Sequence, residues 1–113
     1  MLSGYRFGRI EAGGRTYTDD IKVIDGRVIP DWWRRRGHQV DTGDVADILA
    51  AQPETVVFGT GSAGRMTLTD QLKQTLEDEG IEWIAAPTAE AVQTFNRLLT
   101  SRQSLAGGFH LTC

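Results

Sequence analysis

The most unusual stretch of the sequence combines aromatic and basic side chains between Asp31 and His38. Three arginines, two tryptophans and one histidine fall within the seven residues 32–38. Arginine presents paired N–H donors to phosphate and carboxylate groups, and arginine and tryptophan dominate the energetics of protein interfaces. The composition therefore indicates a recognition surface. The alternative is that the two tryptophans are core residues and the arginines form a solvated rim.

The local spacing predicts how these side chains are placed. Asp31 is expected to cap one short helical turn from Trp32 to Arg36, which Gly37 ends. Side chains four residues apart share a helix face, so we expect the guanidinium group of Arg36 to stack on the indole ring of Trp32. Aromatic and basic side chains together also bind single-stranded nucleic acid. We do not expect that partner, because the net charge is -3 and no second basic cluster follows.

A glycine-rich segment, Gly59 to Gly64, matches the G-x-G-x-x-G pattern of nucleotide-binding loops and follows the apolar run 55–58. Two features argue against a dinucleotide. The next helix is predicted to begin near Thr69, after the motif, and the next strand ends in Ala85-Ala86, without an acid for a ribose hydroxyl. Two interpretations stay open: a tight turn from strand to helix, or a site for a small anion on bare backbone amides.

The two histidines and the single cysteine are the remaining candidates for chemistry. His110 lies in a predicted final strand in which Cys113 points to the opposite face, so the two are poor candidates for a nucleophile–base pair within that strand. A contact between Cys113 and His38 stays open. The three side chains lack the paired spacing of zinc sites. We therefore expect no metal, no cofactor and no catalytic residue, and a single cysteine excludes an internal disulfide.

The elements that position these residues follow from the apolar pattern. Two hairpins are predicted near the start, residues 5–10 with 15–18 around Gly13-Gly14, and residues 21–24 with 27–29 around Asp25-Gly26. Helices are expected over residues 44–51, 70–79 and 89–100, the last two capped by Thr69 and Thr88, and later strands over residues 55–58, 81–85 and 107–113. Strands 55–58 and 81–85 flank a helix, so we expect them to be parallel. Asp41, Asp44 and Asp47 recur every third residue, as at a helix start.

The length and composition indicate one globular domain over residues 1–113. Apolar residues make up 40% and charged residues 24% of the chain, which is ordinary globular usage. A length of 113 residues is too short for a six-stranded dinucleotide-binding domain. No apolar run approaches the ~20 residues that span a bilayer. The first residues lack an apolar signal core. We therefore expect no membrane association and a cytoplasmic location.

Four segments occur in an order that resembles a known family: Asp31–Arg34 with Gly37-His38, Val56–Gly61, Thr88–Asn96 and His110–Cys113. They are similar to the small domain shared by the adipogenesis-associated domain-containing protein and the mitochondrial complex I assembly factor three, which has stand-alone members in bacteria and archaea. The resemblance covers nearly the whole chain. It implies an α/β fold with three layers, β+α/β/α, and a mixed central sheet of about five strands whose last strand runs antiparallel.

The resemblance implies no enzymatic reaction, since the best-understood relatives act as assembly or accessory factors. Matching the motifs residue by residue marks a candidate binding surface formed by Trp33, Arg34, His38, Gly59, Thr60, Gly61, His110 and Cys113. The sequence thus favours a binding or assembly-accessory domain that docks a protein partner, without turnover of its own. The alternative is a small-molecule or anion-binding protein, or an enzyme, that uses the amides of residues 59–64. A third interpretation is a twofold homodimer.

Overall fold

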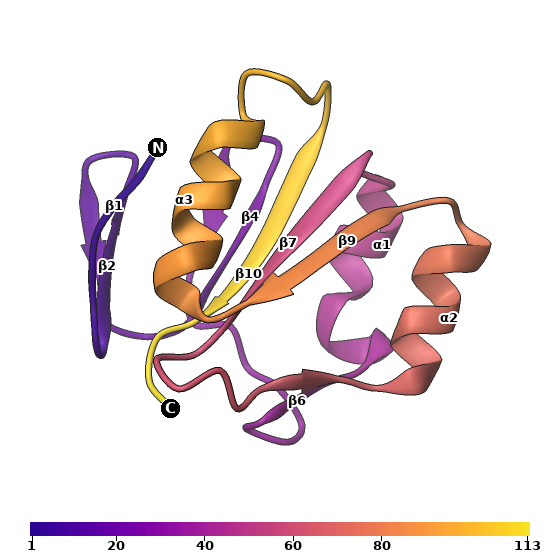
Figure 1. Ribbon diagram of the computed structural model, residues 1–113, viewed down its shortest axis with the longest axis horizontal. Helices are drawn as coiled ribbons and strands as arrows, with labels where there is room; N and C mark the ends of the chain where they lie inside the picture. The colour runs from indigo at the N-terminus through magenta and orange to yellow at the C-terminus, as the bar shows by residue number, and fades with distance from the viewer.

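The computed structural model describes residues 1–113 and is organised around a mixed five-stranded sheet (Figure 1). The strand order is β5 (Arg27–Ile29), β4 (Ile21–Ile24), β10 (Leu105–His110), β7 (Thr55–Thr60) and β9 (Glu82–Ala86). The strands β10, β7 and β9 are parallel, as predicted for the last two. The final strand β10 is antiparallel to its other neighbour, β4. The predicted mixed α/β fold is therefore confirmed.

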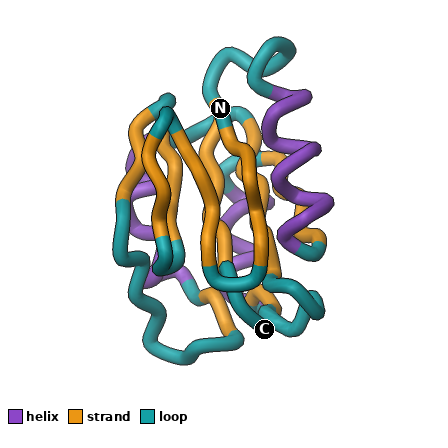
Figure 2. The backbone as a smooth tube through the Cα atoms, turned by 90° about the vertical axis from the view of Figure 1, so that its left-hand side faces the viewer, coloured by secondary structure: helices purple, strands orange, loops and turns teal.

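The sheet is covered on both faces, which explains why β7 and β10 are buried along their whole length. On one face lie α3 (Thr88–Leu98) and a three-stranded antiparallel sheet of β1 (Leu2–Arg6), β2 (Arg9–Ala12) and β3 (Arg15–Tyr17). Figure 2 shows that sheet with α3 beside it. On the other face lie α1 (Ala46–Ala51) and α2 (Asp70–Asp78). Two separate hydrophobic clusters fill the spaces between the layers.

The first hairpin is confirmed at its turn, because β2 and β3 pair antiparallel around Gly13-Gly14, but its first strand differs from the prediction. The single strand expected over residues 5–10 is wrong, because a turn at Phe7-Gly8 divides it into β1 and β2. Gly8 adopts a φ of 82°, in the left-handed region that glycine enters without steric cost. The second hairpin is confirmed, with Asp25 and Gly26 both at positive φ between β4 and β5.

The first helix begins at the predicted acidic residues. A short 3₁₀ turn, η1 (Thr42–Val45), leads into α1. The Asp41 carboxylate accepts a hydrogen bond of 2.8 Å from Thr42 N, and the Asp44 carboxylate accepts one of 2.9 Å from Asp41 N. This reciprocal pair satisfies N–H groups that would otherwise lack partners at the helix start.

The two predicted threonine caps have different outcomes. Thr69 Oγ1 accepts a hydrogen bond from Leu72 N at 3.1 Å, so the cap of α2 is confirmed. The cap expected at Thr88 is wrong, because Pro87 occupies that position and Thr88 is the first residue of α3. The Thr88 hydroxyl instead donates to His110 O at 2.6 Å and accepts from Gly61 N at 2.8 Å. It therefore ties the ends of β7 and β10 together.

The remaining boundaries shift slightly from the prediction. The last strand covers residues 105–110 instead of 107–113, and α3 ends at Leu98. A small parallel pair, β6 (Gln39–Val40) with β8 (Thr67–Leu68), was not predicted from the sequence.

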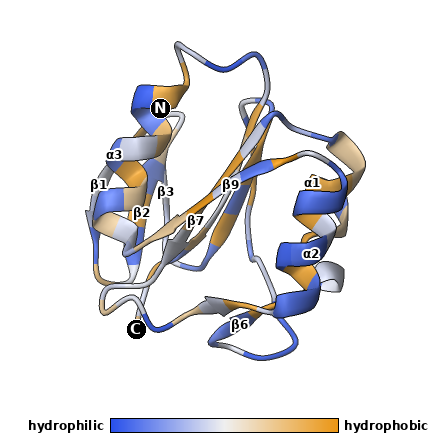
Figure 3. Cartoon of the chain, turned by 45° about the vertical axis from the view of Figure 1, so that its right-hand side comes forward, coloured by the Kyte–Doolittle hydropathy of each residue, from blue (hydrophilic) through white to orange (hydrophobic).

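Figure 3 shows hydrophobic residues concentrated along the central strands and hydrophilic residues on the outer parts of the helices. None of the helices has the length and apolar character needed to cross a membrane.

Candidate functional site

The segment between β5 and β6 forms an irregular loop. The helical turn expected over residues 32–36 is wrong: Asp31 has a φ of 54°, which is incompatible with the extended backbone of a helix cap. Trp32 N instead donates a hydrogen bond of 2.8 Å to Asp20 O. This hydrogen bond attaches the start of the loop to the turn that precedes β4.

The two tryptophans have opposite environments. Trp32 is 5% exposed, and its Nε1 donates to Asp44 O at 2.9 Å. Its ring lies over Gly108, where a Cβ atom would be 2.8 Å from the indole, so only glycine fits beneath it. Trp33 is 86% exposed. Trp32 is therefore a core residue, whereas Trp33 is a surface residue.

Arg34 takes the position that the helical prediction assigned to Arg36. Its guanidinium carbon lies 4.5 Å from the centre of the Trp32 ring, so the expected stacking of Arg36 on Trp32 is wrong. Arg34 Nη2 donates to Asp20 Oδ2 at 2.8 Å and to Gly37 O at 2.9 Å, and Nε donates to the same carbonyl at 3.2 Å. Only 5% of the Arg34 side chain is exposed. Arg34 therefore holds the loop in place from the inside.

Asp20 joins Arg34 to His110. Its Oδ2 also lies 2.8 Å from His110 Nδ1, and its Oδ1 accepts a hydrogen bond of 2.7 Å from Leu111 N. Because a carboxylate can only accept, Nδ1 carries the proton, and the 3.2 Å approach of Arg34 Nη2 to Nδ1 is a packing contact. His110 Nε2 and Arg34 Nη1 are buried without a hydrogen-bond partner. The exposed His38 ring packs edge-on against the His110 ring, with centroids 5.8 Å apart.

Asp20 is the central residue that sequence reasoning missed. It follows Asp19 in the turn between β3 and β4, where an acidic residue is unremarkable. Its importance arises from its approach to Arg34 and His110, which come from distant parts of the chain. No local signal marks it, since the spacing between these three residues carries no motif.

The glycine segment forms a tight turn in which the amides of Gly61, Ser62 and Gly64 donate within the protein. Gly59 and Thr60 belong to β7, and Gly61 turns the chain with a φ of 99°. Gly61 N donates to the Thr88 hydroxyl, and Ser62 N donates to Thr112 O at 2.6 Å. Gly64 N donates to Gly61 O at 3.2 Å. These three amides are engaged within the protein, so the interpretation of residues 59–64 as a tight turn fits the structure.

Close packing explains why glycine occupies positions 59 and 61. A Cβ on Gly59 would lie 2.9 Å from both the Thr88 hydroxyl and the Phe109 ring, and one on Gly61 would lie 2.5 Å from the Cys113 carbonyl carbon. Cys113 is exposed, and its thiol makes no hydrogen bond to His38 or His110. The structure thus gathers Arg34, His38 and His110 in one cluster. The residues of the glycine turn meet Cys113 through its backbone.

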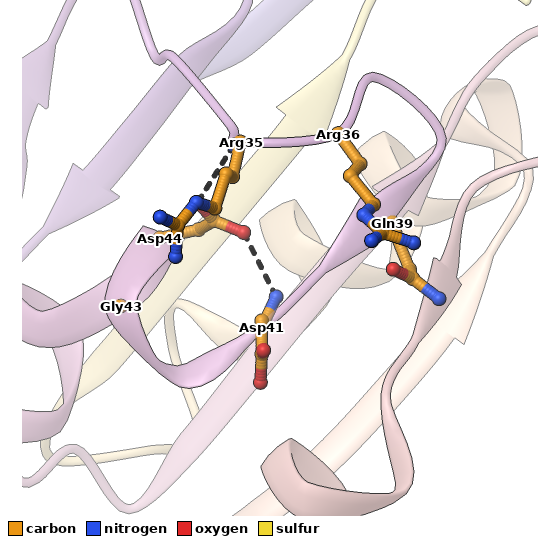
Figure 4. Close-up of a pocket in the computed structure, with 6 residues that line it drawn as sticks. All are labelled: Arg35, Arg36, Gln39, Asp41, Gly43 and Asp44. Carbon is orange, nitrogen blue, oxygen red and sulfur yellow. Dashed lines mark hydrogen bonds between the residues drawn. The ribbon is translucent and has the colours of Figure 1, made fainter.

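Two hollows adjoin the exposed side of the loop. The larger, about 560 Å³, is lined by Trp33, Arg34 and Arg35, together with residues 18–20 and Thr112. The smaller, about 340 Å³, is lined by Arg35, Arg36, Gln39, Asp41, Gly43 and Asp44 (Figure 4). Arg35 N donates to the Asp44 carboxylate at 3.0 Å, whereas the side chains of Arg35 and Arg36 form no ion pair or hydrogen bond. Two unpaired guanidinium groups therefore flank this hollow.

No group of three His, Cys, Asp or Glu side chains lies close enough together to hold a metal ion.

The Tyr5 hydroxyl donates a hydrogen bond to Leu111 O at 3.2 Å. Burial raises the pKa of Tyr5, a hydrogen bond with Thr88 lowers it, and the nearby charge of Asp20 raises it further. Tyr5 therefore stays protonated near neutral pH and acts as a hydrogen-bond donor.

Residues 2–110 match the model of a family described as a protein of unknown function (DUF498/DUF598). The chain belongs to this family. No curated protein matches this DUF498/DUF598 member.

Several solved structures share the fold of this chain. A conserved hypothetical protein from Pyrococcus horikoshii is 25% identical to this DUF498/DUF598 member, with a TM-score of 0.84 over 100% of this chain and 99% of the other. A structure named MT938 is 27% identical, with a TM-score of 0.79 over 100% and 98% of the two chains. A Bordetella pertussis protein described as an Mth938-like domain is 18% identical, with a TM-score of 0.72 over 98% and 85%, and shows a shared fold. None of these descriptions states an activity.

Proposed function

We propose that this DUF498/DUF598 member is a binding domain that docks a protein partner through a surface formed by Trp33, Arg35 and Arg36, here called the Trp33 face. The observation that carries the proposal is that Trp33 is 86% exposed on a loop whose neighbouring side chains, Trp32 and Arg34, are buried. A tryptophan held out on an anchored loop loses little conformational entropy on binding, which favours its use as an interface anchor.

A second exposed aromatic side chain supports the same surface. Phe7 is 66% exposed in the turn between β1 and β2. That turn is attached to the end of β10, because Gly8 N donates to Leu111 O at 2.9 Å, and the next residue, Thr112, lines the larger hollow beside Trp33. Phe7 and Trp33, which come from distant segments, thus both lie near residues 111–112. This arrangement suits an extended contact with a partner protein.

The charges favour a partner with carboxylates around a pocket for the indole. The guanidinium groups of Arg35 and Arg36 are unpaired, whereas the chain as a whole has a net charge of -3. The resemblance to assembly and accessory factors agrees with a domain that acts by docking. In this proposal the domain binds its partner in the cytoplasm, as its single cysteine suggests, and catalyses no reaction of its own.

Affinity capture followed by titration of the recovered partner tests the proposal. The Trp33→Ala variant and the Arg35→Ala/Arg36→Ala double variant are compared with wild type. Leu99→Ala and Arg97→Ala, exposed residues at the end of α3, serve as matched controls. We expect Trp33→Ala to weaken binding by roughly thirtyfold, as for an interface hot spot, and the controls to bind normally. Equal binding by wild type and Trp33→Ala would remove this face from the interface.

Sedimentation of the purified chain separates a partner protein from a second copy. A twofold dimer that Trp33→Ala dissociates would identify the partner as the chain itself. A monomer at all concentrations leaves the surface available for a different protein.

A further inference from the structure

The chain leaves β7 and β9 toward opposite faces of the central sheet. After β7 it leads to α2, whose Leu72 and Leu76 belong to one hydrophobic cluster. After β9 it leads to α3, whose Val92 and Phe95 belong to the cluster on the opposite face. Because β7 and β9 are parallel neighbours, their carboxyl ends lie side by side with diverging connections (Figure 1). In open α/β sheets this arrangement leaves the crevice in which ligands bind.

A hollow of about 370 Å³ occupies this position. Thr60 at the end of β7 and Ala86 at the end of β9 both line it, and Ala63 and Gly64 contribute from the glycine segment. Six of its eleven lining residues are hydrophobic. Its volume falls within the range of small-molecule sites, which are mostly apolar with a few polar groups that orient the ligand. The glycine segment therefore shapes a wall of an apolar crevice instead of forming a cradle of free amides.

The apolar part of the crevice is built from well-packed side chains. Met66 is 2% exposed and Leu68 is 6% exposed, so both are fixed in the protein while still lining the hollow. Trp83 adds its ring from β9 and is only partly buried. A ligand of moderate size would cover apolar surface that otherwise contacts water, which is the main favourable contribution to binding at such a site.

Lys73 is the only charged residue that lines the crevice. It lies on α2 with its Nζ 5.7 Å from the centre of the Trp83 ring. It forms no ion pair, and none of the lining residues is acidic. An ammonium group without a counter-ion, on a partly buried lysine at the edge of an apolar surface, is complementary to one negative charge on an otherwise apolar molecule.

We propose that this crevice binds a small organic monocarboxylate, with its apolar body against Trp83 and Ala85 and its carboxylate at Lys73. A phosphate group fits less well, because a single ammonium supplies the only charge and the neighbouring amides of Gly61 and Ser62 already donate within the protein. The crevice is formed by residues other than those of the Trp33 face. The proposal therefore stands or falls independently of partner docking.

NMR titration of the folded, isotope-labelled chain tests this site with three probes of the same length: hexanoate, its uncharged amide hexanamide, and the cation hexylamine. We expect saturable shifts of the backbone amides of Ala63, Gly64, Lys73 and Ala85 with hexanoate in the millimolar range. Hexanamide should bind about tenfold more weakly and hexylamine should not bind, because the ion pair with Lys73 is lost or becomes repulsive.

Three variants make the result decisive. Lys73→Gln should weaken hexanoate binding about tenfold and leave hexanamide binding unchanged. Arg65→Gln removes an equal charge from an exposed residue outside the lining and should change neither. Ala85→Leu fills the crevice from an exposed position of β9 and should abolish binding while the spectrum stays that of the folded chain. Equal binding of hexanoate and hexanamide, an unchanged affinity in Lys73→Gln, or the absence of saturable shifts would overturn the proposal.

Discussion

Asp20 and His110 are 90 residues apart in the chain, yet His110 Nδ1 donates a hydrogen bond of 2.8 Å to Asp20 Oδ2. The same carboxylate oxygen accepts the hydrogen bond from Arg34 at 2.8 Å. One partly buried acid, Asp20, thus connects the final strand of the central sheet with the loop that carries Trp33. The position of the exposed tryptophan depends on a contact that no segment of the sequence contains by itself.

Replacing Asp20 with asparagine should destabilise the protein strongly. The change keeps the shape of the side chain but leaves the buried guanidinium of Arg34 without its counter-ion, for which we expect a loss of about 3 kcal/mol in the free energy of unfolding. Chemical denaturation measures this difference. Asp19→Asn, at the exposed neighbouring position, should change stability by less than about 0.5 kcal/mol. Equal effects of the two substitutions would show that the ion pair does not hold the loop.

The two adjacent tryptophans should separate stability from binding. Trp32→Ala removes a buried ring over Gly108 and should cost about 3 to 5 kcal/mol of folding free energy. Trp33→Ala should leave the free energy of unfolding within about 0.5 kcal/mol of wild type, because its side chain is mostly in water. Denaturation curves of both variants provide the measurement. A large loss of stability in Trp33→Ala would mean that its exposed ring serves the fold.

Gly61→Ala should weaken the junction of β7, α3 and the end of the chain. The alanine would have to adopt a φ of 99°, and its Cβ would meet the Cys113 carbonyl, so we expect a loss of at least about 1 kcal/mol. Gly43→Ala is the control, because Gly43 lies in η1 with open space around it and no positive φ. Thermal unfolding of the two variants compares them. A Gly61→Ala protein as stable as Gly43→Ala would contradict the tight packing of this turn.

Glu82 should contribute stability that disappears in acid. The hydrogen bond from the Thr55 hydroxyl, followed by that from Arg102, lowers the pKa of Glu82 below its usual value. A carboxyl group whose pKa is lower in the folded state stabilises the fold above its unfolded pKa, and this contribution is lost as the pH falls through the folded pKa. Glu82→Gln should therefore be less stable than wild type at neutral pH and equally stable in strong acid.

Thr55→Val isolates the main cause of that shift. The substitution keeps the shape of a buried side chain but removes the hydroxyl that donates to Glu82 at 2.7 Å, so the pKa of Glu82 should rise toward its usual value. NMR titration of the Glu82 carboxyl carbon in both proteins measures the change. An unchanged pKa in Thr55→Val would assign the shift to Arg102 instead.

The predictions from local pattern were accurate where a segment's own residues decide its conformation. The apolar run at 55–58, the capping hydroxyl of Thr69 and the Asp25-Gly26 turn all appear in the structure at their expected places. They failed where a distant contact competes with the local preference. Thr88 has the chemistry of a helix cap, but its hydroxyl bonds to Gly61 and His110 because the ends of two strands meet there.

The candidate site shows the same division. Composition alone drew attention to Trp33, Arg34 and His110, and the structure brings Arg34 and His110 together. Composition could not tell Trp32 from Trp33, because adjacent identical side chains have the same propensities and only packing against Gly108 buries one of them. It also could not mark Asp20 or Lys73, which are ordinary charged residues in an ordinary turn and an ordinary helix.

By itself, then, the sequence determined most of the central strands and the three helices, the mixed α/β class and the likeness to a family of unknown function. Only the tertiary structure decided which glycine amides are free, which arginine is buried and where a crevice opens beside Lys73. The physical reason is the separation along the chain of the residues that interact. Periodicity and turn chemistry act between residues a few positions apart, whereas burial and hydrogen-bond partners depend on which distant segments fold against one another.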